Sequence, residues 1–144
     1  MHVTPSPSEN KILLAARVAR LATASATGEP LAVPVCFVYL EPWIYTPIDK
    51  KPKKASWKGL RRVKNISANP SVSLVIDEYS EDWGQLRYMI INGRAEIISV
   101  GAEYSESLRA LSSKYPQYRE MGLEEAGLPV IRITPVRIIS WGKP

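Results

Sequence analysis

Three apolar segments with strand-like composition follow one another near the start of the chain, and their spacing limits the fold more than any other feature. They are Val18–Ala24, Leu31–Leu40 and Trp43–Thr46. The links between them are short, whereas parallel strands need a connection of a dozen or more residues. The three segments therefore predict an antiparallel meander. Pro34 lies inside the second segment and has no N–H to donate, so this segment is expected at a sheet edge or a bulge.

Further strands and a few helices follow, without regular alternation between the two. Ser6–Glu9 has the pattern of a helical capping box, with Pro7 suited to the first helical position. The remaining periodicity predicts helices at Ser56–Ala68 and Glu103–Tyr115 and strands at Val72–Tyr79, Leu86–Ile98, Leu128–Thr134 and Val136–Trp141. The last two are either separate strands or one strand with a kink at Pro135. This order argues against a doubly wound parallel sheet. The predicted fold is mainly β: an antiparallel barrel with short helices across its openings.

Length and composition predict one folded domain. The chain has 144 residues, of which 45% are hydrophobic and 23% charged. We expect a single domain over residues 1–144, with residues 1–8 flexible. The longest apolar stretch, Leu31–Leu40, is shorter than the ~20 residues that a membrane-spanning helix needs. No secretory signal is visible and there is one Cys, so we expect a cytoplasmic protein without membrane contact.

The few reactive side chains argue against several kinds of active site. The chain contains one His, at position 2, and one Cys, at position 36. A zinc site of the Cys/His kind needs more ligands, and a Ser-His-acid triad would have to use His2. The glycines form no phosphate-binding loop motif. We therefore expect no metal site and no catalytic side chain, and an enzyme with this sequence would take its reactive group from a cofactor.

Basic residues concentrate in one segment. Eight of the 19 Lys and Arg residues lie between Lys50 and Lys64, and the net charge is +5. Three interpretations stay open: a solvated surface, nucleic-acid binding with Trp57 as a stacking surface, and binding of a small anionic cofactor. The second is disfavoured because the chain lacks closely interleaved aromatic residues. Lysines on a loop after a strand suit the third, since ammonium groups bind phosphate as point charges.

A series of short motifs resembles a known family in both order and spacing. The motifs are Leu21–Ala24, Gly28–Pro30, Val33–Val35, Tyr45–Lys53, Leu60–Asn65, Asn69–Leu74, Asp82–Arg87 and Gly93–Ala95. Together they resemble the pyridoxamine 5'-phosphate oxidase-like superfamily of FMN-binding split β-barrels. The closest resemblance is to the branch described as probable F420-dependent oxidoreductases. It covers about residues 10 to 142.

The resemblance implies a homodimer with two cofactor sites between the subunits. Members of the superfamily bind FMN, the deazaflavin coenzyme F420 or occasionally haem; F420 is the first expectation here and FMN the alternative. The implied cofactor-binding residues are Lys50, Lys53 and Arg61 for the phosphate with Thr46 close by, Val33, Pro34 and Val35 at the ring, and Trp83, Arg87 and Trp141 from the same or the other subunit.

One departure from the family pattern bears on the reaction. Genuine pyridoxamine phosphate oxidases carry an Arg-x-His motif near the C-terminus, whereas this chain ends Ile138–Pro144 without a His. The resemblance therefore implies hydride transfer between F420 or FMN and a small organic substrate, not the vitamin B6 reaction. The alternative is a non-catalytic module that binds a flavin, or nucleic acid, through the Lys50–Lys64 segment.

Overall fold

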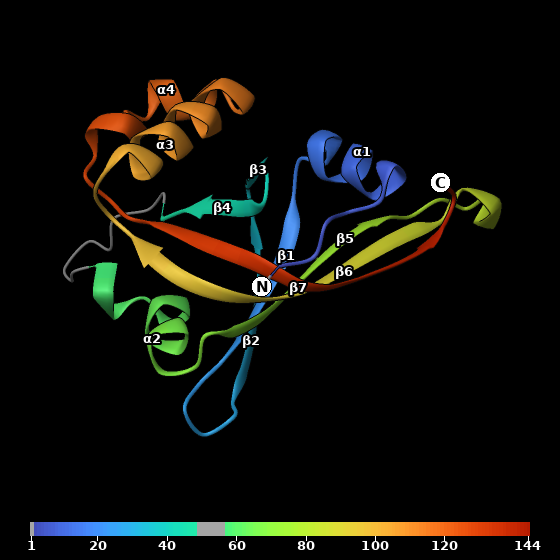
Figure 1. Cartoon of the computed structure of the whole chain (residues 1–144), viewed down its shortest axis with the longest axis horizontal. Coiled ribbons are helices and arrows are strands. Elements are labelled where there is room, and N and C mark those ends of the chain that lie inside the picture. The colour runs from blue at the N-terminus through green and yellow to red at the C-terminus, as the bar shows by residue number, and fades with distance from the viewer. Residues whose placement is uncertain (1, 49–56) are drawn as a thin grey trace.

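The computed structural model describes residues 2–48 and 57–144 (Figure 1). Its strands are β1 (Ala19–Ala24), β2 (Pro30–Val35), β3 (Val38–Leu40), β4 (Trp43–Pro47), β5 (Ser71–Glu78), β6 (Arg87–Ile98) and β7 (Val130–Gly142). Its helices are α1 (Pro7–Ala15), α2 (Arg61–Ala68), α3 (Ala102–Lys114) and α4 (Gln117–Glu120), with the 3-10 turns η1 (Trp57–Gly59), η2 (Trp83–Gln85) and η3 (Leu123–Glu125). No helix in the described ranges is long and apolar enough to cross a membrane.

The strands form one antiparallel sheet that is forced to curl. Its order is β2-β1-β5-β6-β7-β4-β3, so the consecutive strands β2 and β3 lie at its two edges. Only Cys36 and Phe37 separate these strands. Three Cα–Cα steps reach about 11 Å at most, so both edges must approach each other at this point. The result is the predicted split barrel, closed at one end of the sheet and open at the other.

The structure divides one predicted strand and decides between one strand and two near the C-terminus. The segment Leu31–Leu40 is not one strand: its first half pairs with β1 and its second half, after the two connecting residues, pairs with β4. The meander is therefore interrupted in the middle of this segment. At the other end of the chain, Leu128–Thr134 and Val136–Trp141 correspond to one strand, β7, which is the alternative with a kink at Pro135. Its register with β6 shifts where Gly93 opposes Pro135. Pro135 causes a local irregularity there, because a proline cannot complete the ladder.

The helices agree with their sequence signals, apart from the start of α2. At α1, Ser6 Oγ accepts from Glu9 N–H at 3.2 Å and Ser6 N–H donates to Glu9 Oε1 at 2.9 Å, which confirms the capping box. The helix predicted at Ser56–Ala68 begins as α2 only at Arg61, after the turn η1, and Ser56 lies outside the described residues. The loop expected after α3 contains two short helical turns, α4 and η3.

Two apolar cores lie on either side of the β3–β4 edge. The main core fills the curled sheet beneath α1 and α2, and its fully buried members include Leu21, Phe37, Ile44, Ile91 and Ile133. The second core lies between α3, α4 and the sheet, and it contains Val38, Tyr45, Leu108, Leu111, Tyr115, Tyr118, Leu123 and Val130. The apolar stripe predicted on α3 faces this second core.

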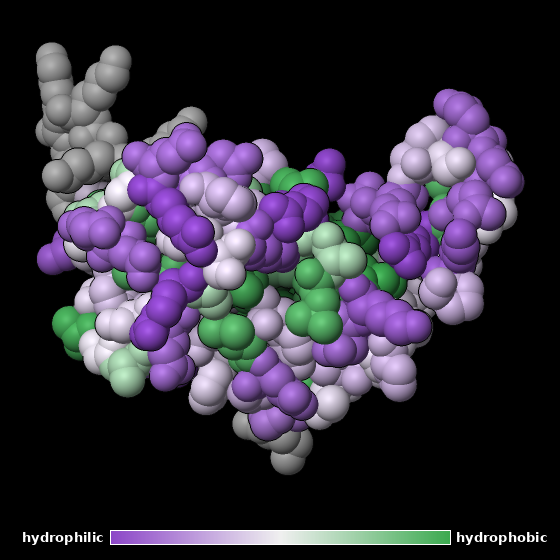
Figure 2. Space-filling view, turned by 90° about the horizontal axis from the view of Figure 1, so that it is seen from above, coloured by the Kyte–Doolittle hydropathy of each residue, from purple (hydrophilic) through white to green (hydrophobic). Residues whose placement is uncertain are grey.

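Strands β5, β6 and β7 continue beyond the closed part of the sheet as a projecting ribbon, which we call the arm (Figure 1). It comprises residues 77–88 and 137–144 and ends at η2. At its tip Gly142 has a φ of 99°, and a Cβ there would collide with the carbonyl of Leu86. In Figure 2, hydrophobic side chains gather in the middle of the upper face, and the tip of the arm projects beyond them at the right.

Candidate functional site

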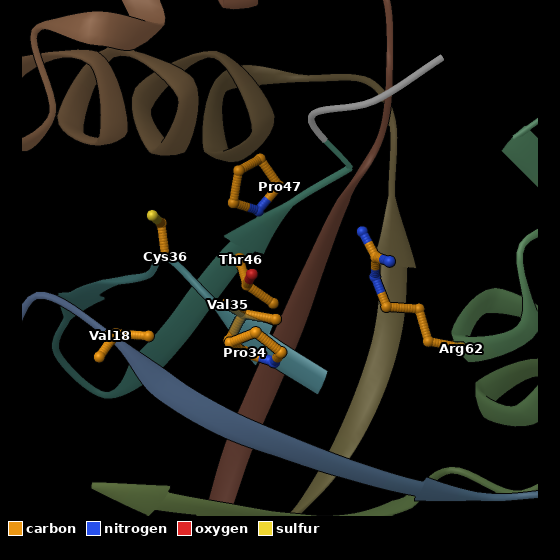
Figure 3. Close-up of a pocket in the computed structure, with 7 residues that line it drawn as sticks. All are labelled: Val18, Pro34, Val35, Cys36, Thr46, Pro47 and Arg62. Atoms are coloured by element: carbon orange, nitrogen blue, oxygen red, sulfur yellow. The ribbon is translucent and has the colours of Figure 1, made fainter. Parts of the chain in front are cut away.

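A cleft of about 170 Å³ lies where the ends of β2 and β4 face the first turn of α2 (Figure 3). It is lined by Val18, Pro34, Val35, Cys36, Thr46, Pro47 and Arg62. Its floor comes from two strands that are distant in the sheet order but close in space because the sheet curls. The cleft is thus a direct product of the two-residue connection between β2 and β3.

The sequence of β2 suits one wall of this cleft. Among the described residues, β2 pairs only with β1, and Pro34 opposes Arg20 in that pairing. The other edge of β2 therefore has no strand beside it, and Pro34 is tolerated there because no ladder hydrogen bond is needed. Pro34 and Val35 both reach the cleft because it lies at the edge and end of the strand. They present a rigid, apolar surface.

Arg62 is aimed into the cleft by the packing of α2. Val63 and Ile66 are buried against the main core, and Asn65 Nδ2 donates to Thr23 Oγ1 at 2.9 Å in a buried hydrogen bond. These contacts fix the rotation of the helix. They leave the guanidinium of Arg62 pointing across the cleft toward Thr46 and Pro47 (Figure 3).

The charge of the cleft is positive and lacks an internal partner. Among the described lining residues, Arg62 is the only charged one. Its Nε is buried and has no hydrogen-bond partner within the described part of the chain. A buried donor left unpaired costs about 1–3 kcal/mol, more when it is charged. The positive guanidinium that points across the cleft suits a ligand with an anionic group, and Pro34 and Val35 suit an apolar part of that ligand.

The predicted phosphate-binding residues divide into three groups. Thr46 lines the cleft and is almost fully buried. Arg61 does not line the cleft: its exposed side chain lies 3.6 Å from Glu29 in an ion pair on the surface, and the neighbouring Arg62 takes the position facing the cleft. Lys50 and Lys53 lie outside the described residues.

The predicted ring-facing residues behave differently from one another. Pro34 and Val35 line the cleft, whereas Val33 is half-buried, packs against the main core and is not among the lining residues. Sequence reasoning did not select Val18, Cys36, Pro47 or Arg62. For Arg62 a signal existed, since it directly precedes Val63 in the periodic apolar series of the predicted helix.

The last three predicted residues lie on the arm, far from the cleft in the same chain (Figure 1). Trp83 is 72% exposed in η2, and Trp141 is 55% exposed. The Trp141 ring stacks on Tyr88 with 5.7 Å between centroids. Arg87 donates to Glu78 at 2.6 Å. Within one chain, the structure thus does not bring these residues together with Pro34, Val35 and Thr46.

The side chains near the cleft offer little acid–base chemistry. Cys36 is the only lining residue with a nucleophilic thiol. Tyr45 precedes Thr46 but packs into the second core, where burial and Glu103 raise its pKa to about 12. Within the ranges that the structure describes, no three His, Cys, Asp or Glu side chains are grouped so as to hold a metal ion. Among the described residues that line the cleft, none is a carboxylic acid or a histidine.

Comparison with known proteins places the chain among relatives of the same fold. It is similar to the conserved hypothetical protein Rv2991 from Mycobacterium tuberculosis, with 17% identity, a TM-score of 0.78, and coverage of 98% of this chain and 86% of that one. It is also similar to the haem storage protein HutZ from Vibrio cholerae, with 16% identity, a TM-score of 0.75 and coverage of 98% and 96%.

A further solved structure is an FAD-binding protein from Mesorhizobium loti, with 24% identity, a TM-score of 0.73, and coverage of 97% of this chain and 95% of that one. At these identities the likeness concerns the fold. None of the curated proteins compared with the chain matches it. The family model for pyridoxamine 5'-phosphate oxidase matches residues 7–142, almost the whole chain. The chain therefore belongs to the pyridoxamine 5'-phosphate oxidase family, in its broad sense of flavin-binding split barrels.

Proposed function

We propose that the protein is an oxidoreductase that binds coenzyme F420, or alternatively FMN, in the cleft and transfers hydride to or from a small organic substrate. The observation that carries this proposal is the guanidinium of Arg62, which points across a cleft without carboxylates among its described lining. A phosphate satisfies such a donor with a charge-assisted hydrogen bond. Membership of a flavin-binding family supports the same choice.

The residues of the cleft fit such a cofactor. Arg62 would hold the phosphate, with the buried hydroxyl of Thr46 on the facing strand. Pro34 and Val35 would meet the flat face of the ring. The chain leaves β4 at Pro47 and continues toward the predicted phosphate ligands Lys50 and Lys53. When bound, the cofactor would supply the hydride chemistry, which this chain's side chains cannot.

The preference for F420 over FMN rests on charge. F420 carries a phosphodiester and a glutamate tail, so it presents more negative charge than FMN. The sequence places four lysines, at 50, 51, 53 and 54, directly after the strand that ends at the cleft. One phosphate does not need that many cations. The surplus supports the more anionic cofactor.

The protein would act by positioning. Hydride transfer requires donor carbon and acceptor to be held close and aligned, and positioning alone can lower a barrier by about 7–11 kcal/mol. We propose that no side chain is an indispensable acid, base or nucleophile. Arg62 and the predicted lysines would place positive charge beside the cofactor, where it stabilises negative charge that develops during transfer.

We further propose that two copies of the chain form a homodimer in which the arm of one completes the cleft of the other. The arm exposes Trp83, Tyr88, Ile139 and Trp141, a set of large apolar side chains that one chain leaves uncovered. Exposed apolar patches of this kind mark interaction sites. The dimer would also unite the two groups of predicted site residues, which lie far apart within one chain.

Haem binding without turnover is a second candidate, suggested by the similarity to a haem storage protein. Haem iron needs an axial ligand, most often His, Cys, Met or Tyr. The chain's single His, His2, is exposed and is not among the cleft residues, and Cys36 is the one thiol in the cleft. A haem site here would therefore depend on a Cys36 thiolate. Family resemblance alone also leaves open a flavin carrier without turnover.

Absorption and binding measurements test these proposals. Protein purified from its native source should release F420 or FMN on denaturation, identified by mass spectrometry, and apoprotein should bind the same compound in a fluorescence titration. Reduced cofactor should then be oxidised by a small organic acceptor only when the protein is present. A Soret band that disappears in Cys36→Ser would instead support haem, and failure to bind F420, FMN and haem would contradict all three.

A further inference from the structure

Cys36 and Phe37 connect β2 and β3, and we call these two residues the crossover. Side chains at the C-terminal end of α3 form hydrogen bonds with its backbone. Phe37 lies between strands, so its backbone has no ladder partner of its own. Its N–H instead donates to the hydroxyl of Tyr115 at 3.2 Å, and its carbonyl accepts from Lys114 Nζ at 2.9 Å. Two consecutive side chains of one helix end thus satisfy a fully buried residue.

The Tyr115 hydroxyl also contacts the backbone just before β1. The Tyr115 hydroxyl lies 2.9 Å from the carbonyl oxygen of Arg17 and 3.0 Å from that of Phe37, so its proton can be donated to either. The Arg17 guanidinium donates to the carbonyl of Lys114 at 2.7 Å and lies 4.6 Å from the centre of the Tyr115 ring. Three segments far apart in sequence therefore meet at one buried side chain.

Both backbone segments held by Tyr115 lead directly into the cleft. Val18 follows Arg17, Cys36 precedes Phe37, and both Val18 and Cys36 line the cleft (Figure 3). The spacing between these two residues sets the width of that side of the cleft. Because β1 and β2 pair only as far as Ala19 and Val35, no sheet hydrogen bond reaches them.

We propose that Tyr115 is a positioning residue for the cleft: its hydroxyl, together with the Lys114 ammonium, holds the crossover and the start of β1 so that Val18 and Cys36 keep their places in the wall. Tyr115 itself is not among the residues that line the cleft. It acts through the backbone of its two neighbours. The test by titration with FMN or F420 rests on the proposed function. The test by modification of Cys36 does not.

The only cysteine of the chain provides a direct probe of this wall, because Cys36 is in the crossover. Tyr115→Phe removes the hydroxyl alone. The matched control is Tyr104→Phe, on the same helix about 16 Å away along its axis, where the hydroxyl donates to the carbonyl of Leu128 at 2.7 Å. Tyr104→Phe loses the one hydrogen bond that its hydroxyl donates. Tyr115→Phe loses two: the one accepted from Phe37 N–H and the one donated to the carbonyl of Arg17 or Phe37. Of the two variants, Tyr115→Phe alone changes contacts of the crossover.

The rate at which dithionitrobenzoate modifies Cys36 in the folded apoprotein is the first measurement. Tyr115→Phe should be modified at least about fivefold faster than the parent, since fivefold is the factor for a single lost hydrogen bond and this variant loses two, and Tyr104→Phe less than about twofold faster. Unchanged modification in Tyr115→Phe overturns the proposal. So does an equal acceleration in both variants, since that would reflect general destabilisation.

A second variant and a second readout keep the two proposals apart. If Tyr115→Phe does not fold, Lys114→Met, which keeps the side-chain stem and removes the ammonium, is judged by the rates at a pH where the thiol is fully ionised, because the Lys114 ammonium interacts electrostatically with Cys36. Titration with FMN and F420 should show about tenfold weaker binding for Tyr115→Phe and less than about twofold for Tyr104→Phe. A parent protein that binds neither compound contradicts the proposed function, while the modification rates still decide the role of Tyr115.

Discussion

The two ends of β7 carry the same kind of residues and meet opposite surroundings. Near its start, in the closed half of the sheet, Ile131 and Ile133 are 0% exposed. Near its end, on the arm, Ile139 is 36% exposed and Trp141 is 55% exposed. Both ends pair with β6 along their length. The difference lies in what covers the sheet. At the start of β7, α1, α2 and the curled strands enclose the main core. At its end α1 contacts Ser140, whose Oγ donates to Glu9 Oε2 at 2.6 Å, but Ile139 and Trp141 stay exposed.

This contrast shows what an alternating apolar pattern can and cannot tell. The pattern identifies side chains that gain by leaving water, at about 25 cal/mol per Å² of apolar surface. It does not identify the surface that covers them. In the closed half, other elements of the same chain pack over these side chains. The cleft lies where this packing leaves a gap. On the arm, we propose that the cover comes from a second copy.

Placing a charge on the arm should have the largest effect, because it should dissociate the proposed dimer without unfolding the closed half. Ile139→Arg would bury an unpaired cation in the proposed interface, at a cost of about 3–5 kcal/mol, and should convert the dimer to a 16.1 kDa monomer. Val100→Arg is the control, since Val100 is 80% exposed beside α3 and off the arm. Light scattering should show the mass halved in Ile139→Arg alone. A parent protein that is monomeric at micromolar concentration with cofactor present would refute the dimer.

Truncating one isoleucine at each end of β7 sharpens the contrast between the two halves. Ile133→Ala should lower the free energy of unfolding by about 2–5 kcal/mol, because a fully buried side chain leaves a cavity. This loss should not depend on protein concentration. Ile139→Ala should have a smaller effect that grows with concentration as dimers form. Urea denaturation at two concentrations measures both, and a concentration-independent loss of equal size in both variants would speak against the distinction.

Much of the fold follows from local signals in the sequence. The capping box at Ser6–Glu9, the apolar stripe on α3 and the antiparallel class each depend on neighbouring residues, and the structure confirms them. The division of Leu31–Leu40 between two sheet edges does not follow from local signals. Its apolar residues are equally suited to one continuous strand, and only the curl of the whole sheet decides that Cys36 and Phe37 leave the ladder.

The candidate site shows the same limit. Pro34, Val35 and Thr46 were expected from resemblance and line the cleft. Arg61 was expected from the same resemblance, but Arg62 lines the cleft. Successive residues of a helix point about 100° apart, and the buried contacts of Val63 and Ile66 fix the rotation of α2. The separation of Trp83 and Trp141 from the cleft depends on tertiary structure, which no local pattern encodes.

Two adjacent arginines test whether the closed half alone holds the cofactor. Arg62→Met should weaken binding of FMN or F420 by about 1.5–3 kcal/mol, the range for a hydrogen bond to a charged group. Arg61→Met should change it by less than about 1 kcal/mol, because its side chain is exposed and paired with Glu29. Fluorescence titration of both variants checks this. Equal losses, or none in either, would mean that Arg62 does not meet the phosphate.

The smallest expected effect is a pH dependence that distinguishes the closed half from the arm. The arm's ion pairs, such as Arg87 with Glu78, involve exposed carboxylates. In the closed half, burial lowers the pKa of Lys114 from its ordinary 10.5 to about 8, and nearby Arg17 lowers it further while Cys36 opposes this. Between pH 8 and 10.5 the unfolded chain therefore binds more protons at this residue than the folded chain.

The sign of this effect is fixed by that proton difference. The contribution of Lys114 to stability should rise with pH across the window, because folding no longer requires a charged amine in a half-buried position. Above pH 10 the buried tyrosines, including Tyr45 with its pKa of about 12, act in the opposite direction, since the folded chain then holds the extra protons. The useful window is thus pH 8 to 10. Urea denaturation of the parent and of Lys114→Met should show a stability difference that shifts in favour of the parent as pH rises through this window, and a difference that stays constant would show that Lys114 titrates normally.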